Sequence, residues 1–188
     1  MKRVTKEQEM GRIFREHMSD LYWLAFLLTG DRERSVQAFT GALHSDATSP
    51  AFENFLVSWA RRLVIVAALG TMRGEIRESM LRTRPATNGL GELAPLAPLD
   101  RARLTKREIE EVLLGMDVFP RCTVILTVLE GLPVREAASL LGASEDTVKA
   151  AQARGVAELT WRMAGALRPV SQPLFRLGQA VAALAATS

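Results

Sequence analysis

The chain has 188 residues, of which 48% are hydrophobic, and its 24 basic and 21 acidic side chains leave a formal charge of only +3. This length and apolar content suffice for one large domain or two small helical ones and argue against a disordered chain. A single cysteine excludes an internal disulfide and fits a reducing compartment. No apolar stretch approaches the roughly 20 residues that span a bilayer, and the N-terminus lacks a secretory signal, so we expect a soluble, cytoplasmic protein.

Helical periodicity dominates the front half of the chain, and strand alternation is nearly absent. The first helix is expected over 6–28, with Gly30 ending it, and the second over 31–43. A serine followed by a proline then marks the start of a long third helix over 49–81. The apolar positions expected to face inward are Ile13, Phe14, Leu21, Leu24, Ala25, Leu28, Val36, Phe39 and Leu43.

The character of the sequence changes at residues 83–103, where three prolines, two glycines and no sustained period indicate a flexible linker. After it, Thr105 and Glu108 form a capping box, which predicts a helix that ends near Gly115. A further helix is expected over 120–130, because it begins with proline and is followed by glycine.

The expected fold is therefore all-α, with a helical domain over 1–82, the linker, a second helical domain over 104–168 and a tail over 169–188. Apolar residues recur at helical spacing in the tail, which indicates a short amphipathic helix. That helix could pack against its own domain, or it could bind a partner or a membrane surface. Its apolar positions are Leu174, Leu177, Val181 and Leu184.

Residues 133–159 have the pattern of a helix-turn-helix. Pro133 suits the first turn of a helix, where a missing N–H costs nothing, and Gly142 lies where that helix must stop in a left-handed turn. Ser144 can then cap the second helix. The small and apolar positions expected to face inward are Ala137, Ala138, Leu141, Val148, Ala151 and Val156.

The second helix of such a motif enters the major groove of DNA, so its outward side chains would meet phosphates and base edges. The candidate DNA contacts are Arg135, Ser144, Thr147, Lys149, Gln152 and Arg154. The alternative for the two cations on this helix is that they are merely solvated, and for Thr147 that it only starts the helix. Residues 104–168 hold eight basic and nine acidic side chains, so DNA affinity must come from local placement or from a partner.

The long helix of the front half carries a second candidate site, in which Trp59 precedes the basic pair Arg61 and Arg62. Together they could cradle an unpaired strand, since stacking on an aromatic ring is worth about 1–3 kcal/mol per base. The alternative is an indole that packs in the core. Trp23 and Trp161 fall within apolar helical spacing and are expected to be core residues.

The sequence offers little for catalysis. His17 and His44 are far apart, and no cluster of cysteines or carboxylates completes a metal site. Glu110 and Glu111 are neighbours on a helix and therefore point about 100° apart. Cys122 lies in an apolar run and is expected to be a small buried residue. We predict no catalytic residues, no metal and no cofactor.

Taken together, residues 10–80 and 105–160 resemble the extracytoplasmic-function sigma factors, which are bacterial transcription initiation subunits of RNA polymerase. The front half resembles the family through LYWLAFLLTGDRERSVQAF and FLVSWARRLVIVAAL, and the back half through FPRCTVILTVLEGLPVREAASLLGASEDTVKAAQARGVAEL. The matching positions of the back half are Glu130, Gly131, Leu132, Glu136, Ala137, Leu141, Gly142, Thr147, Val148, Lys149 and Arg154.

The resemblance implies a front domain, over 1–82, that clamps the polymerase core and holds one strand of the melted promoter. It implies a back domain, over 104–168, that places a recognition helix, about 145–158, in the major groove upstream. The implied partners are RNA polymerase core and promoter DNA, with an inhibitory regulatory protein as a further option. Sigma factors have no chemistry of their own. They favour promoter opening by binding the opened form of the promoter better than the closed form.

The chain departs from the family pattern at positions that carry function. Gln37 and Thr40 stand in the segment that docks on the polymerase, where the family has aspartate and glutamine, and they are the candidate polymerase contacts. The full set of departures is Gln37, Thr40, Gly41, Arg62, Val66, Ala150 and Ala151. They leave two alternatives open: a degenerate sigma-like interaction module with DNA binding reduced or lost, and a helix-turn-helix repressor that dimerises through its front domain. The front-domain resemblance argues against the repressor.

Overall fold

A computed structural model describes residues 6–45, 56–82 and 105–166, and within these ranges the chain is all-α, as predicted, without a strand. The helices of the front half are α1 (Lys6–Glu16), α2 (Met18–Thr29), α3 (Arg32–Leu43), α4 (Leu56–Thr71) and α5 (Arg73–Arg82). Those of the back half are α6 (Lys106–Leu114), α7 (Val118–Val124), the π-helical turn η3 (Ile125–Leu129), α8 (Val134–Leu141) and α9 (Glu145–Ala166). The predicted linker and tail lie outside the described residues, and the domain limits stay predictions.

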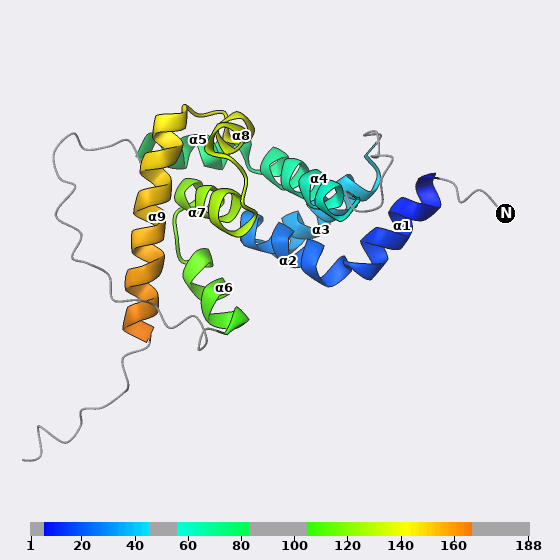
Figure 1. Cartoon of the computed structure of the whole chain (residues 1–188), viewed down its shortest axis with the longest axis horizontal. Helices are drawn as coiled ribbons and strands as arrows, with labels where there is room; N and C mark the ends of the chain where they lie inside the picture. Colours follow the sequence, from blue (N-terminus) through cyan, green and yellow to red (C-terminus); the bar gives the residue numbers. More distant parts are fainter. Residues whose placement is uncertain (1–5, 46–55, 83–104, 167–188) are drawn as a thin grey trace, which may run out of the picture.

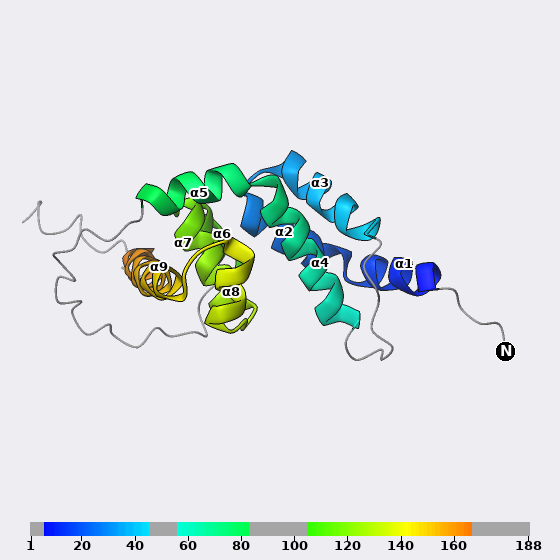
Figure 2. The same ribbon diagram turned by 90° about the horizontal axis from the view of Figure 1, so that it is seen from above.

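The front half is a bundle in which α2, α3 and α4 pack on one another, with α1 at one end of the molecule. The helix α5 leads from this bundle towards the back half and packs on α7. In Figures 1 and 2, α9 lies at the end of the molecule opposite α1, with α6, α7 and α8 between it and the bundle. The buried apolar residues of the two halves form one continuous cluster.

The single helix predicted over 6–28 is wrong at one position, because the chain breaks at His17 into α1 and α2. His17 has φ −107° and ψ 16°, and the amide of Asp20 donates to its carbonyl at 3.1 Å in a tight turn. The break redirects the chain. The rings of Phe14 on α1 and Phe39 on α3 then meet edge-on, with their centroids 5.4 Å apart, and Leu21 on α2 is fully buried. The bend is therefore a consequence of packing on both sides of His17.

The long helix predicted over 49–81 is likewise interrupted, at Met72. The amide of Met72 donates to the carbonyl of Leu69 at 3.2 Å, and its side chain is buried at the bend. The new direction lets α5 bury Ile76 and Ser79 against the back half. The predicted start of this helix at residues 49 and 50 lies outside the described residues.

The back half opens with the predicted capping box. The amide of Glu108 donates to Oγ1 of Thr105 at 3.3 Å, and the Thr105 amide donates to Oε2 of Glu108 at 2.8 Å, which lowers the pKa of that carboxyl. The next helix begins at Val118 rather than at Pro120, because Asp117 caps it by accepting from the Val118 amide at 2.9 Å. Pro120 lies in its first turn, where a proline is tolerated.

Two apolar residues expected in the core are exposed. The buried face of α3 consists of the small residues Ser35, Ala38 and Ala42. Val36 lies about 100° around the helix from Ser35 and is 54% exposed. Trp161 is 74% exposed because Met163, two residues on, faces the core instead. Trp23 is only half-buried, and its indole N–H donates to Glu110 at 3.1 Å.

Gly142 provides a stability test, because its φ of 65° is the left-handed conformation and nothing lies within 4 Å of a Cβ added there. Gly142→Ala should lower the free energy of unfolding by about 1–2 kcal/mol through backbone strain alone. Gly41, inside α3, has equally open surroundings and an ordinary φ, so Gly41→Ala should raise the free energy of unfolding by about 0.5–1 kcal/mol. Urea unfolding of the two variants measures the difference, and changes of the same sign would contradict the assignment of a strained turn.

Candidate nucleic-acid interface

The helix pair α8 and α9 and the turn between them lie where the sequence predicts them. Gly142 ends α8, and its amide donates to the carbonyl of Ala138 in the left-handed turn. The hydroxyl of Ser144 accepts from the amide of Thr147 at 3.2 Å, so Ser144 caps α9 as predicted. The two hydroxyls of Ser144 and Thr147 also hydrogen-bond each other at 2.8 Å.

The inward face of α9 is set by its contact with α7. Val148 and Ala151 are fully buried. A Cβ on Gly155 would lie 2.5 Å from Cγ2 of Val124 and 3.3 Å from the carbonyl oxygen of Pro120, so only glycine allows this approach. Ala151, one of the two departures on this helix, therefore faces the core and cannot contact DNA in this arrangement.

The outward face of α9 consists of two small residues with a cation on each side. Ala150 and Ala153 are exposed, and so are Lys149 and Arg154. Five positions separate the two cations, which places them about 140° apart around the helix, at the two edges of the alanine surface. Such a surface can approach a groove closely while the cations reach towards the phosphates on either side.

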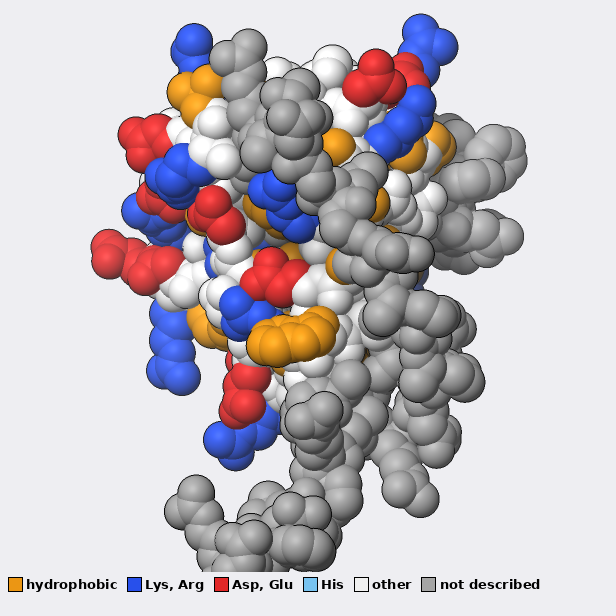
Figure 3. Space-filling view, turned by 90° about the vertical axis from the view of Figure 1, so that its left-hand side faces the viewer, with side chains coloured by type: hydrophobic (Ala, Val, Ile, Leu, Met, Phe, Trp, Pro, Cys, Tyr) orange, Lys and Arg blue, Asp and Glu red, His pale blue; other side chains and the backbone are white. Residues whose placement is uncertain are grey.

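The charge on this side of the molecule is mixed. Figure 3 shows Lys and Arg side chains interspersed with Asp and Glu rather than gathered in one patch. Nζ of Lys149 lies 3.6 Å from Oδ1 of Asp146, and the two side chains are 59% and 95% exposed. An ion pair this exposed is weak and can be exchanged for a phosphate. Of the other candidates, Arg135 and Ser144 are exposed, and Gln152 is half-buried.

The second candidate site, on α4, faces the back half of the chain. Nε of Arg61 donates to Oε2 of Glu130 at 2.8 Å, and Nη2 donates to the other carboxylate oxygen. Hydrogen bonding to Glu130 raises the pKa of Arg61, so this arginine is always charged. Arg62 forms an ion pair with Glu136 rather than an aligned hydrogen bond. Trp59 is half-buried and packs against the core.

A cavity of about 540 Å³ lies between these helices. It is lined from the front half by Trp59 and both arginines, and from the back half by Leu129, Leu132 and the two glutamates. The structure thus brings the predicted strand-binding residues together, and it adds acidic partners that the sequence reading did not identify.

The candidate polymerase contacts lie on α3, apart from both groups. Gln37 and Thr40 are exposed, next to the exposed Val36 and Gly41. In Figure 2, α3 lies on the outer side of the front bundle, far from α9. No side chain of these four residues is needed for the core, so this surface is available to a partner.

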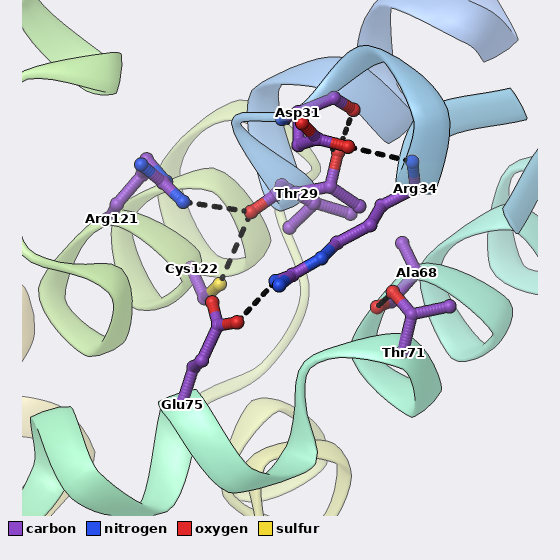
Figure 4. Close-up of polar contacts among 9 residues, drawn as sticks. Thr29, Asp31, Arg34, Ala68, Thr71, Glu75, Arg121 and Cys122 are labelled. Atoms are coloured by element: carbon purple, nitrogen blue, oxygen red, sulfur yellow. Dashed lines mark hydrogen bonds and ion pairs between the residues drawn. The ribbon is translucent and has the colours of Figure 1, made fainter. Parts of the chain in front are cut away.

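The residue that sequence reasoning missed is Arg121, which joins the two halves. Its guanidinium is buried, and Nη2 donates to the carbonyl of Leu28 at 3.2 Å, next to the thiol of Cys122 (Figure 4). A Cβ on Gly30 would lie 3.1 Å from the same nitrogen. Nearby, the amide of Phe119 donates to Oγ of Ser79 at 2.8 Å. An arginine inside the apolar run FPRCTVIL is the signal that could have identified it.

Two further observations apply to residues 6–45, 56–82 and 105–166. No group of three or more His, Cys, Asp and Glu side chains there could hold a metal ion. No helix in these ranges is long and apolar enough to cross a membrane.

The chain is 29% identical over 151 residues to the ECF RNA polymerase sigma factor SigM of Mycobacterium tuberculosis, in two strains of that organism. The match covers 79% of this chain and 74% of the relative. No protein-family model matches the chain.

The buried thiol at the junction of the halves yields a chemical test. Burial raises the pKa of Cys122 to about 12, so the reactive thiolate is absent near pH 8, and the sulfur is covered. A thiol reagent should therefore leave the folded chain unlabelled and label it fully in denaturant, as mass spectrometry would show. Rapid labelling of the native protein would contradict this packing of the two halves, and Cys122→Ala provides the blank.

Proposed function

Because the chain is a divergent relative of the extracytoplasmic-function sigma factors, we propose that it acts in transcription initiation by binding core RNA polymerase and promoter DNA. The observation that supports DNA binding is the outward face of α9, where an exposed alanine surface lies between Lys149 and Arg154. A face of this kind suits the major groove, which admits one α-helix.

In this proposal the two cations contact phosphates, and the helix is positioned in the groove by them. Arg135, at the start of α8, is exposed and reaches the DNA backbone. Gln152 is the candidate for reading a base edge, since its amide can pair with adenine. Ser144 and Thr147 bring the amino-terminal end of α9, with its positive dipole, to a phosphate.

The front half supplies the other contacts of the proposal. Gln37 and Thr40 on the exposed side of α3 dock on the polymerase. Trp59 stacks on a base of the melted strand, and Arg61 and Arg62 bind its phosphates. Binding the opened promoter better than the closed one shifts the equilibrium towards opening, and this needs no chemistry from the chain. The prediction that the chain is not an enzyme agrees with its sigma factor relatives.

Charge explains why a partner is needed. Residues 104–168 carry eight basic and nine acidic side chains, so the back half attracts DNA only locally. The polymerase would supply the remaining affinity and hold the chain on the promoter, in the cytoplasm where transcription takes place. Purified chain, core polymerase and a promoter library should give specific transcripts or a polymerase-dependent footprint.

The second candidate function is a sigma-like module that binds the polymerase without reading DNA. It is favoured by Ala150 and Ala153, which offer no polar group to a base edge, and by Asp146, which pairs with Lys149. Stable polymerase binding without a salt-sensitive shift of promoter DNA would select this second function.

The salt dependence of promoter binding tests the role of α9. Lys149→Gln with Arg154→Gln removes two phosphate contacts, so the slope of log affinity against log salt should fall in magnitude by about two. The measurement is fluorescence anisotropy of a labelled promoter duplex with the chain bound to core polymerase.

Arg12→Gln with Arg107→Gln removes the same charge from exposed residues of α1 and α6 and serves as the control. Its slope should equal that of the unaltered chain. Equal slopes in both double variants would refute the groove assignment.

A further inference from the structure

The outward side of α9 ends in an exposed aromatic ring. Trp161 is 74% exposed, whereas tryptophan is highly buried on average in folded proteins. Ala150 and Ala157 lie within about 40° of Trp161 around the helix, so the three side chains share one side over about three turns. Figure 3 looks onto this end of the molecule and shows hydrophobic side chains between charged ones. We call the surface made by Ala150, Ala153, Ala157 and Trp161 the Trp161 face.

The Trp161 face is turned away from the helices that α9 packs on, which include α6, α7 and α8. A Cβ on Gly155 would meet Val124 of α7, and Ala157 lies about 160° around the helix from Gly155. Val148 and Ala151, on the same side as Gly155, are fully buried. A further helix can therefore pack on the Trp161 face without disturbing these contacts.

The chain that follows α9 can reverse its direction next to this face. The helix ends at Ala166, and Pro169 and Pro173 both lack the N–H that would continue it. Pro173 also suits the first turn of a new helix. Residues 167–173 have the length, roughly 2–8 residues, that connects antiparallel helices. A helix that begins after Pro173 would therefore start beside Trp161.

The apolar residues after Pro173 repeat with the spacing of the Trp161 face. They follow one another at intervals of three, four and three positions and are Leu174, Leu177, Val181 and Leu184. The residues of the Trp161 face follow at intervals of three, four and four positions. Two helices with matched intervals pack along their length, and the alanines leave room for larger side chains. The one charged side chain of residues 169–188, Arg176, lies about 160° around such a helix from Leu174, so the apolar side carries no charge.

We infer that residues 174–184 dock as a helix on the Trp161 face, antiparallel to α9, with Leu174 beside Trp161 and Leu184 beside Ala150. The occupant is this segment of the chain rather than a second protein, because a segment tethered a few residues away is present at a high effective concentration. Docking removes the indole ring and the leucine side chains from water together, and this apolar burial drives the contact.

The docked segment also lies over the alanine surface between Lys149 and Arg154. Promoter duplex and the segment then exclude each other, so the segment lowers duplex affinity until it is displaced. This consequence rests on the proposed function, whereas the docking itself does not.

Cross-linking in the full chain tests the docking. Ala157→Cys with Leu177→Cys places two thiols against each other, whereas Ala157→Cys with Gln179→Cys turns the second thiol about 160° away, to the other side of the segment. Cys122 is buried and stays unreacted. With a short bis-maleimide, the first pair should cross-link within the chain about tenfold faster than the second, as peptide mass spectrometry would show.

Quenching of Trp161 fluorescence by acrylamide gives a second measurement that needs no cysteine. It uses a chain in which the other two tryptophans are replaced by phenylalanine. In that chain Leu177→Gln with Val181→Gln should raise the quenching constant about twofold, because the apolar contact that covers the ring is weakened. Gln179→Ala, on the other side of the segment, should leave the quenching constant unchanged.

Equal cross-linking rates of the two cysteine pairs overturn the inference, and so do cross-links that join two chains, which would assign the Trp161 face to a second copy. The cross-linked Ala157→Cys, Leu177→Cys chain, bound to core polymerase, should bind promoter duplex about tenfold more weakly than the same chain before the reagent is added. Fast cross-linking within the chain without this loss supports the docking and counts against the proposed function. Slow cross-linking, together with duplex binding that depends on Lys149 and Arg154, overturns the docking and leaves the proposed function standing.

Discussion

One buried cation, Arg121, ties the back half of the chain to the end of α2. Taking a guanidinium out of water costs several kcal/mol unless the surroundings compensate for it. Here the carbonyl of Leu28, at the end of α2 where the helix dipole is negative, compensates part of this cost, while Nε of Arg121 has no hydrogen-bond partner within the described residues. Gly30 leaves room for the guanidinium. Phe119 and Cys122, on the same helix, are fully buried. Arg121 therefore ties α7 to the end of α2.

The remaining geometry follows from α7 in sequence. Gly155 lets α9 lie directly on α7, which turns Ala150 and Ala153 outward at the end of the molecule opposite α1. The π-helical turn that continues α7 carries Glu130 to the surface of α4, and α8 follows beside it. One arrangement thus leaves the proposed duplex-binding face exposed and pairs the two arginines of α4 with glutamates of the back half.

How far the sequence could predict this structure depends on the range of each interaction. The cap at Asp31, the capping box at Thr105 and the stop at Gly142 were predictable because their partners lie within a few residues. The breaks at His17 and Met72 were not predictable, since each lets the helices on its two sides pack against helices that are far away in the sequence. The same holds for the ion pairs Arg61–Glu130 and Arg62–Glu136, because only the fold brings residues of the two halves together.

Burial decides what an arginine can do in this chain, and three of them show the range. Arg121 is buried, and within residues 6–45, 56–82 and 105–166 no carboxylate pairs with it, so loss of its contact with Leu28 would leave a buried charge without a partner there. Arg154 is exposed and is available to any anion. Arg61 lies between these extremes, with one third of its side chain exposed and a fixed carboxylate beside it. A guanidinium in that intermediate state pairs with a carboxylate while part of its surface stays open to water.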